Sequence, residues 1–260
     1  MALVAWFRAP TSLTEHTVRA AAAFFIGAFV ALTIVGVRSL FTRASAAVLI
    51  AAVATIGWYL ALHLRFVDLQ NEIISQTWEG WRKIWTDLPA AVPSGDALEE
   101  GAVADRARQF ASALTVAAPL FPAWVALIAL ASARLTWSWY QRIAHTPMLP
   151  PANPFREFRF NDHAVWLLVL LIAPFLLPVP PSVTLVAGNA LVVVGSIYIL
   201  RGAAIAGTSL SRASPLFIGI LLLIMLPFFY IVPIGLAMLG IADTWLDFRR
   251  RRAPASGVSS

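Results

Sequence analysis

Apolar residues form six long runs along the chain, and the segments between them carry most of the charge. A transmembrane helix needs about 20 predominantly apolar residues, and the runs reach or approach that length. The pattern predicts an all-α fold, a polytopic transmembrane helical bundle of about six spanning helices in a single membrane domain, with a disordered tail at 253–260. The expected spans are residues 18–37, 44–64, 111–133, 164–179, 183–200 and 215–241.

Prolines are expected to kink the third and the last of the six runs. The third contains Pro119 and Pro122, and the last contains Pro227 and Pro233. Proline removes a backbone donor and clashes with the preceding turn, so each pair predicts a kink. The last run is then either one kinked crossing or a re-entrant pair of helices. One kinked crossing is the commoner structure, so we expect six crossings; the positive-inside rule favours cytoplasmic termini but does not separate the two topologies.

Small residues recur at helical spacing in several spans. Ala23, Gly27 and Ala31 are four residues apart in the first span, as are Ala47, Ala51 and Thr55 in the second. Such spacing predicts close packing against other helices. The fifth span, which either ends at Leu200 or continues to Gly207, is the candidate for the centre of the bundle because this stretch is rich in small residues, namely Gly188, Gly195, Ser196, Gly202 and Gly207.

Residues 68–88, between the second and third spans, have the periodicity of an amphipathic helix. Trp78, Trp81 and Trp85 share its apolar face, and Pro89 ends the segment. Three indole rings on one face are typical of a helix in the membrane interface, so we interpret them as interfacial anchors. The alternatives are a lid over a cavity between the spans and a docking face for a partner.

Composition places the chain among integral membrane proteins. Hydrophobic residues make up 60% and charged residues 12%, and the mean hydropathy is +0.78, whereas a soluble domain has about 25% charged residues. A net charge of +6 would suggest nucleic acid in a soluble chain. Here the basic residues stand mostly at the ends of apolar runs, where they meet lipid headgroups. We therefore expect the lipid bilayer, and no nucleic acid, as a partner.

Two further segments are predicted to lie at the membrane surface. The connection PPANPFREFRF, residues 150–160, combines phenylalanines with Arg156 and Arg159, which can pair with lipid phosphates. The chain leaves its last span through LGIADTWLDFRRRR, residues 239–252. In that segment we interpret Trp245, Arg249 and Arg250 as interfacial anchors.

Four polar residues at or near membrane depth are candidates for lining a cavity or pairing helices: Asn189, Arg201, Asp243 and Asp247. Asn189 can hydrogen-bond to a neighbouring helix or bind a ligand. Arg201 either snorkels to the interface or lies inside the membrane, where an ionisable residue is by default a functional hypothesis. If the last run crosses once, Arg201 and Asp243 lie at opposite ends of the membrane and cannot pair. If the run is re-entrant, they can.

The sequence carries no recognisable catalytic or metal-binding motif. It has no Walker lysine motif, HExxH, GxSxG or DxD pair, and no paired acids deep in a span. It has no cysteine, which excludes disulfides and thiolate chemistry. The four histidines stand at span ends without the spacing of metal ligands, at His16, His63, His145 and His163. We therefore expect no enzyme activity, no catalytic residue, no metal site and no cofactor.

The order of three motifs resembles a known family. PPANPFREFRF precedes a tryptophan-containing span, an asparagine-led span ends in ILRGAAI, and LGIADTWLDFRRR follows near the end. Over roughly residues 120–252 this order resembles the YybS-like family of bacterial polytopic membrane proteins, a domain of unknown function. The resemblance implies the bacterial cytoplasmic (inner) membrane. The architecture is also similar to the substrate-binding membrane subunits of energy-coupling-factor vitamin transporters.

Two function classes fit these observations. The first is a transport or solute-binding membrane subunit, in which the kinked spans and the fifth span surround a cavity lined by Asn189 and Arg201. The second is a non-transporting scaffold or assembly factor that binds a membrane-protein partner or forms a homo-oligomer. The proline kinks favour transport, and the scarcity of intramembrane polar groups favours the scaffold. The sequence does not specify the small-molecule substrate.

Overall fold

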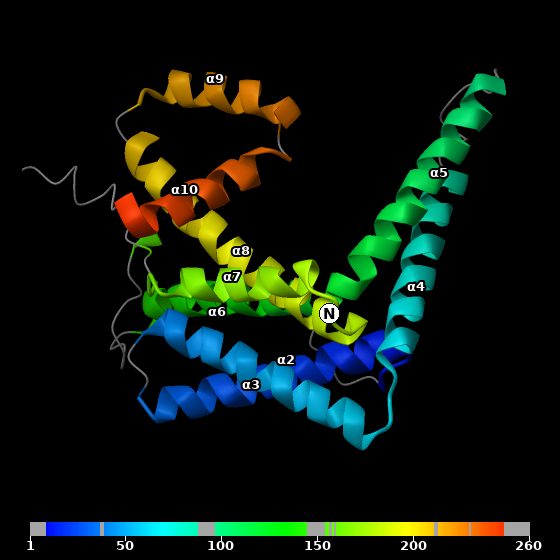
Figure 1. The fold of residues 1–260 in the computed structure, drawn as a ribbon, viewed down its shortest axis with the longest axis horizontal. Coiled ribbons are helices and arrows are strands. Elements are labelled where there is room, and N and C mark those ends of the chain that lie inside the picture. Colours follow the sequence, from blue (N-terminus) through cyan, green and yellow to red (C-terminus); the bar gives the residue numbers. More distant parts are fainter. Residues whose placement is uncertain are drawn as a thin grey trace, which may run out of the picture. The chain divides into compact units, whose positions relative to one another are not determined.

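Every regular element of the described chain is a helix in the computed structural model (Figure 1). The structure describes residues 9–36, 39–87, 97–144, 154–155, 158, 160–210, 213–228 and 230–246. The chain divides into two compact units, Met1–Pro147 and Met148–Ser260. The first unit contains α2 (Leu13–Ile34), α3 (Leu40–Ala61), α4 (Phe66–Asp87), α5 (Ala97–Ala117), the 3-10 turn η2 (Ala118–Leu120) and α6 (Phe121–Ile143). The second contains α7 (Ala164–Leu176), α8 (Pro181–Leu210), α9 (Pro215–Met225), the 3-10 turn η4 (Leu226–Phe228) and α10 (Val232–Leu246).

Several of these helices have the length and composition of membrane spans. Among the described residues four helical segments qualify, namely Leu13–Ile34, Leu40–Ala61, Ala104–Ile143 and Pro181–Thr208. A fifth is added if α9 and α10, which are bent by 110°, form one span. Helix α7 has 13 residues and is therefore about 20 Å long, shorter than the hydrocarbon layer of about 30 Å. The prediction of an all-α polytopic membrane bundle is confirmed.

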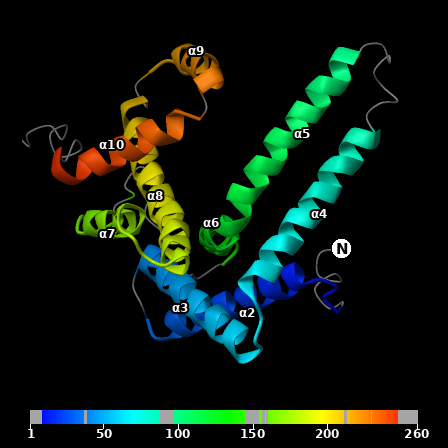
Figure 2. The ribbon, with the colours of Figure 1, turned by 45° about the vertical axis from the view of Figure 1, so that its right-hand side comes forward.

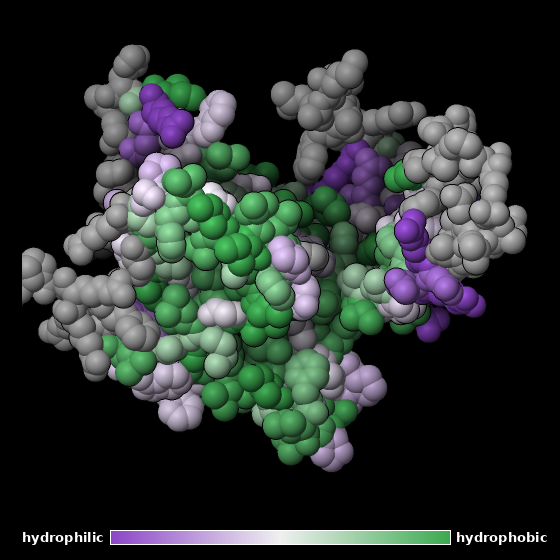
Figure 3. Space-filling view, turned by 90° about the horizontal axis from the view of Figure 1, so that it is seen from above, coloured by the Kyte–Doolittle hydropathy of each residue, from purple (hydrophilic) through white to green (hydrophobic). Residues whose placement is uncertain are grey.

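Apolar side chains cover much of the surface of the described chain (Figure 3). Ile34, Leu60 and Leu176 are 81%, 71% and 79% exposed. Soluble proteins rarely expose contiguous apolar surface on this scale. The exposed surface is therefore of the kind that lipid covers.

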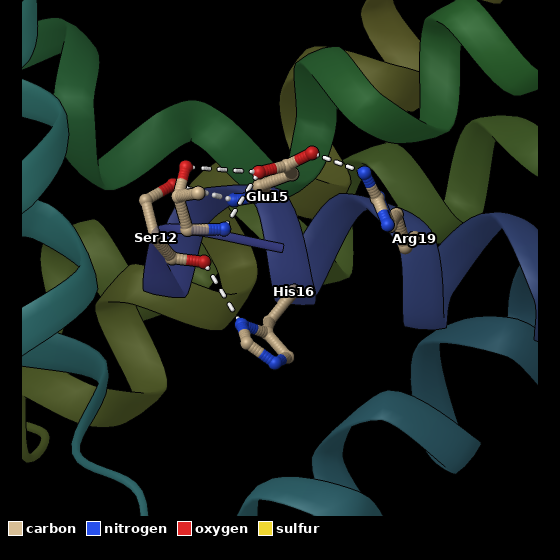
Figure 4. A network of polar contacts seen from close by, with 5 residues as sticks. Ser12, Glu15, His16 and Arg19 are labelled. Carbon is tan, nitrogen blue, oxygen red and sulfur yellow. Dashed lines mark hydrogen bonds and ion pairs between the residues drawn. The ribbon is translucent and has the colours of Figure 1, made fainter. Parts of the chain in front are cut away.

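The beginning of α2 is fixed by a network of polar contacts (Figure 4). The Ser12 hydroxyl accepts a hydrogen bond from the backbone N–H of Glu15 at 3.1 Å, which caps the helix. The Glu15 carboxylate accepts from the backbone N–H of Thr11 at 2.9 Å and pairs with Arg19. This arrangement is close to a capping box. It starts the helix at Leu13, five residues before the apolar run that was predicted as the span.

Two contacts join α2 to its neighbours in the first unit. The hydroxyls of Thr17 in α2 and Tyr59 in α3 are 2.6 Å apart. The backbone N–H of Thr14 donates to the Glu72 carboxylate of α4 at 3.1 Å. A carboxylate at a helix N-terminus also interacts favourably with the helix dipole. Helices α2, α3 and the first turns of α4 are thus held together at one end of α2.

The small-residue stripes differ in what they contact. Ala47 and Ala51 of α3 are buried, as the spacing predicted. Ala23, Gly27 and Ala31 of α2 are exposed instead, and a Cβ at Gly27 would meet nothing within 4 Å. The prediction that the α2 stripe packs against another helix is wrong within the described chain, because α2 presents a different face to α3.

Helices α4 and α5 lie side by side and run in opposite directions, joined by stacked aromatic rings (Figures 1 and 2). The rings of Trp78 and Trp81 stack with centroids 5.1 Å apart. Phe110 of α5 stacks on both, at 6.2 Å and 5.3 Å. The tryptophan face of the amphipathic helix thus has a partner inside the chain. The interfacial role of these tryptophans stays a prediction, and the side chain of Trp85 lies outside the described residues.

Replacing Phe110 by alanine should loosen this helical hairpin. Two ring contacts are lost, each worth about 0.5–1.5 kcal/mol beyond area burial, so the local opening of α4 should become easier by about 1–3 kcal/mol. Hydrogen–deuterium exchange of α4 amides should then accelerate by roughly 5- to 150-fold. Trp139→Ala is the matched control, because Trp139 is an exposed aromatic residue on α6. Equal exchange in α4 for both variants would show that the ring stack does not hold the hairpin.

Candidate functional site

Arg201 lies well inside a helix, not at its end. The sequence predicted a span over 183–200, but α8 continues to Leu210. Nine further residues correspond to about 13 Å of helix beyond Arg201. The Arg201 side chain is 0% exposed. The arginine therefore lies within a span-length helix, with its side chain covered by protein.

Two carboxylates hold the Arg201 guanidinium. Nε donates to Asp243 Oδ2 at 3.1 Å, and Nη2 lies 3.0 Å from the same oxygen. Nη1 donates to Asp162 Oδ1 at 2.8 Å. The ring of Phe160 lies 5.4 Å from Cζ, within the range of a cation–π contact. We call Arg201, Asp162 and Asp243 the Arg201 cluster.

The two carboxylates of the Arg201 cluster have very different surroundings. The Asp243 side chain, on α10, is 0% exposed, whereas the Asp162 side chain, just before α7, is 56% exposed. A buried carboxylate depends on its partner for charge compensation, because desolvation costs several kcal/mol per ion. An exposed carboxylate can exchange its partner for water at small cost. Asp243 is therefore the fixed partner of Arg201, and Asp162 is the exchangeable one.

Glycines bring α8 and α10 into backbone contact beside the Arg201 cluster (Figure 2). A Cβ at Gly202 would lie 1.8 Å from the carbonyl oxygen of Leu236. A Cβ at Gly240 would lie 2.2 Å from the carbonyl oxygen of Tyr198. Both distances are far below van der Waals contact, so only glycine fits at either position. The close crossing brings Asp243, one turn beyond Gly240, to Arg201.

A break in the last apolar run makes this crossing possible. Helix α9 ends at Met225, the turn η4 contains Pro227, and α10 starts at Val232, at 110° to α9. The run is therefore not one gently kinked helix. The sequence tied pairing of Arg201 and Asp243 to a re-entrant last run, and the two side chains do pair in a run that bends by 110°.

Two buried hydroxyls lie next to the Arg201 cluster in sequence and on the same two helices. Tyr198 precedes Arg201 by one turn of α8, and Thr244 follows Asp243 on α10. The two hydroxyls contact each other, because Tyr198 has a side-chain hydrogen bond with Thr244. The Tyr198 ring packs edge-on against Phe160 at 4.9 Å. A hydroxyl can both donate and accept, so each keeps hydrogen-bonding capacity beyond this contact.

The other predicted site residues do not join the Arg201 cluster within the described part of the chain. The Asn189 amide donates to the Leu185 carbonyl of its own helix at 3.0 Å. Trp245 is 68% exposed at the end of α10, where an indole ring can contact lipid. The predictions for the remaining residues lie outside the described residues, namely Asp247, Arg156, Arg159, Arg249 and Arg250.

A second buried arginine occupies the first unit. Arg43, in the first turn of α3, is 1% exposed. Its Cζ lies 5.1 Å from the ring of Trp137 and 5.8 Å from that of Phe29. Nη1 donates to the Thr33 hydroxyl at 3.3 Å. These contacts join α2, α3 and α6, so packing accounts for the burial of Arg43.

The chemistry available at the Arg201 cluster is ion pairing and hydrogen bonding. Across residues 9–246, excluding the gaps named above, no group of three or more His, Cys, Asp or Glu side chains could hold a metal ion. The guanidinium offers five N–H donors and no acceptor, and it stays charged. The cluster can therefore bind an anionic or hydrogen-bonding group.

Long apolar helices with lipid-type surfaces define a polytopic helical membrane protein. The chain belongs to the family described as predicted membrane protein (DUF2232), whose model matches residues 2–244. This match agrees with the motif-based resemblance and extends it over the first hundred residues, where the motifs showed none. Comparison with curated proteins and with solved structures gives no match.

Proposed function

We propose that this protein is a solute-binding or transport subunit of the bacterial cytoplasmic membrane and that the Arg201 cluster is its solute site. One observation carries the proposal. A fully buried guanidinium lies within a span-length helix and is held by one buried and one exposed carboxylate. The inner-membrane location rests on the resemblance to bacterial membrane proteins noted above.

The cost of the Arg201 cluster supports a functional role. Insertion scales assign about 2.5–3.5 kcal/mol to an arginine at the centre of a span. A buried ion pair is often no more stabilising than well-packed apolar residues of similar volume. Packing α8 on α10 therefore does not require these charges. Charges inside a membrane domain commonly mark substrate or ion pathways.

The broken α9–α10 segment gives independent support. Discontinuous helices are a common feature of the binding sites of secondary transporters, where they bring polar groups to the solute. Here the break places Asp243 against Arg201. A helix pair bent by 110° also provides an element that can change its angle when the ion pair changes.

The test uses the full chain in lipid nanodiscs and a panel of probes: acetate, lactate, phosphate, tetramethylammonium and glucose. We expect at least one class to raise the thermal unfolding midpoint by several degrees, since a ligand that binds only the folded state stabilises it. The control is Arg201→Met combined with Asp243→Leu, called the paired apolar variant. It removes both buried charges together and should retain the fold.

Shifts that are absent, or equal in wild type and the paired apolar variant, would contradict the solute-site proposal. The second candidate, a scaffold that binds a membrane-protein partner, would then be favoured. It has one specific observation in its support, the α4–α5 hairpin with its aromatic stack. An extended helical hairpin of this kind can dock a partner.

A further inference from the structure

We infer that the solute at the Arg201 cluster is a small organic anion whose carboxylate replaces Asp162 on Arg201 Nη1. This inference rests on the proposed function and specifies its substrate class. The replaced contact is the 2.8 Å hydrogen bond between Nη1 and Asp162 Oδ1. The solute takes over one charge-assisted hydrogen bond, and Asp162 turns to water.

The exposure of the two carboxylates decides where exchange occurs. Displacing Asp243 would leave a fully buried carboxylate without its charge partner, which is strongly unfavourable. Displacing Asp162 releases a side chain that is already 56% exposed, so water compensates its charge. The Nε and Nη2 side of the guanidinium therefore keeps Asp243, and the Nη1 side is the binding position.

The charge of the guanidinium selects an anion. Arg201 has only hydrogen-bond donors and remains positive. With Asp162 turned away, the buried part of the cluster is one positive and one negative group, and Nη1 lacks an acceptor. A neutral oxygen would accept the Nη1 hydrogen bond without carrying a negative charge. A carboxylate makes the stronger, charge-assisted hydrogen bond and is therefore preferred.

The surroundings favour an organic anion with a further oxygen. Phe160 lies over the guanidinium and against the Tyr198 ring, which gives an aromatic wall. The hydroxyls of Tyr198 and Thr244 are buried and contact each other, and each keeps hydrogen-bonding capacity beyond this contact. They can bind a hydroxyl or second oxygen of the solute. A 2-hydroxy acid such as lactate has this combination, whereas acetate has the carboxylate alone.

Asp162→Asn tests the exchange directly. Asparagine keeps the size and an acceptor oxygen but not the charge that competes with the solute. We expect lactate to bind this variant about tenfold more tightly than wild type, measured by equilibrium dialysis in phosphatidylcholine nanodiscs. Asp105→Asn is the matched control, because Asp105 also pairs with an arginine, Arg108, on an exposed part of α5. It should leave lactate affinity unchanged.

The outcomes separate the inference from the proposed function. Equal affinity in the Asp162→Asn and Asp105→Asn variants would overturn the exchange at Nη1. Binding of tetramethylammonium or glucose, lost in the paired apolar variant, would overturn the anion class while retaining a solute site. No binding of any probe would overturn both. Loss of lactate binding when phosphatidylglycerol is added would assign the position to a lipid phosphate and overturn the soluble anion.

Discussion

Arg201→Ala is expected to lower the free energy of unfolding by about 3–5 kcal/mol, because it leaves Asp243 buried without a positive partner. Asp243→Ala should have a similar cost, since it strands the guanidinium. Either loss is a large part of the stability of a typical protein. Sodium dodecyl sulfate titration in mixed micelles, followed by helical circular dichroism, measures the effect.

The paired apolar variant is the control for this prediction. Removing both charges leaves no buried ion uncompensated, and Asp162 is exposed to water, so the stability of this variant should lie within about 1–2 kcal/mol of wild type. The stability costs of the Arg201 and Asp243 substitutions must therefore be strongly non-additive, with an interaction energy of several kcal/mol. Asp162→Ala should cost less than about 1 kcal/mol, because Asp162 is exposed. Additive costs for the Arg201 and Asp243 substitutions would mean that the two side chains do not pair.

The class of fold was predictable from the sequence because the apolar runs are long. Apolar length fixes which segments can cross a bilayer, and four of the expected spans coincide for most of their length with span-length helices. Helix ends were predicted less well. The apolar run begins at Val18, but Ser12 and Glu15 cap the helix at Leu13. Capping uses polar side chains that hydrophobicity does not register.

The pairing of Arg201 with Asp243 was predictable only on the condition that the last apolar run is broken. Sequence reasoning identified Arg201 and Asp243 and tied their pairing to a break in the last run, but it preferred the commoner unbroken topology. Proline indicates where a helix bends and not by how much. The bend of 110° depends on tertiary contacts between α8 and α10, and these contacts are not local in sequence.

Asp162 was missed although the sequence contained a usable signal. Residues 148–243 contain three acidic residues, Glu157, Asp162 and Asp243. A buried arginine needs a carboxylate partner, so these three, together with Asp247, were the candidates in the second unit. Asp162 stands beside aromatic and basic residues that suggested the membrane surface. Its contact with Arg201 joins positions 39 residues apart, which periodicity within one helix does not detect.

Gly202→Ala should destabilise the second unit by about 3 kcal/mol or more, because overpacking here meets backbone and not a movable side chain. The added Cβ would lie 1.8 Å from the Leu236 carbonyl oxygen, and relief of that clash requires the helices to separate by roughly 1.5 Å. Gly195→Ala is the control on the same helix, since its Cβ would meet nothing within 4 Å. It should leave stability unchanged or raise it by about 0.5–1 kcal/mol.

The same substitution tests whether close packing and ion pairing form one unit. A separation of roughly 1.5 Å would take the Arg201 to Asp243 contacts beyond hydrogen-bonding distance, so Gly202→Ala includes part of the cost of losing the pair. In the paired apolar variant that part is already absent, and Gly202→Ala should there cost less by about 1 kcal/mol or more. An identical cost in both backgrounds would mean that α10 keeps its ion pair while it moves. The glycine contact would then position the helix without positioning the charges.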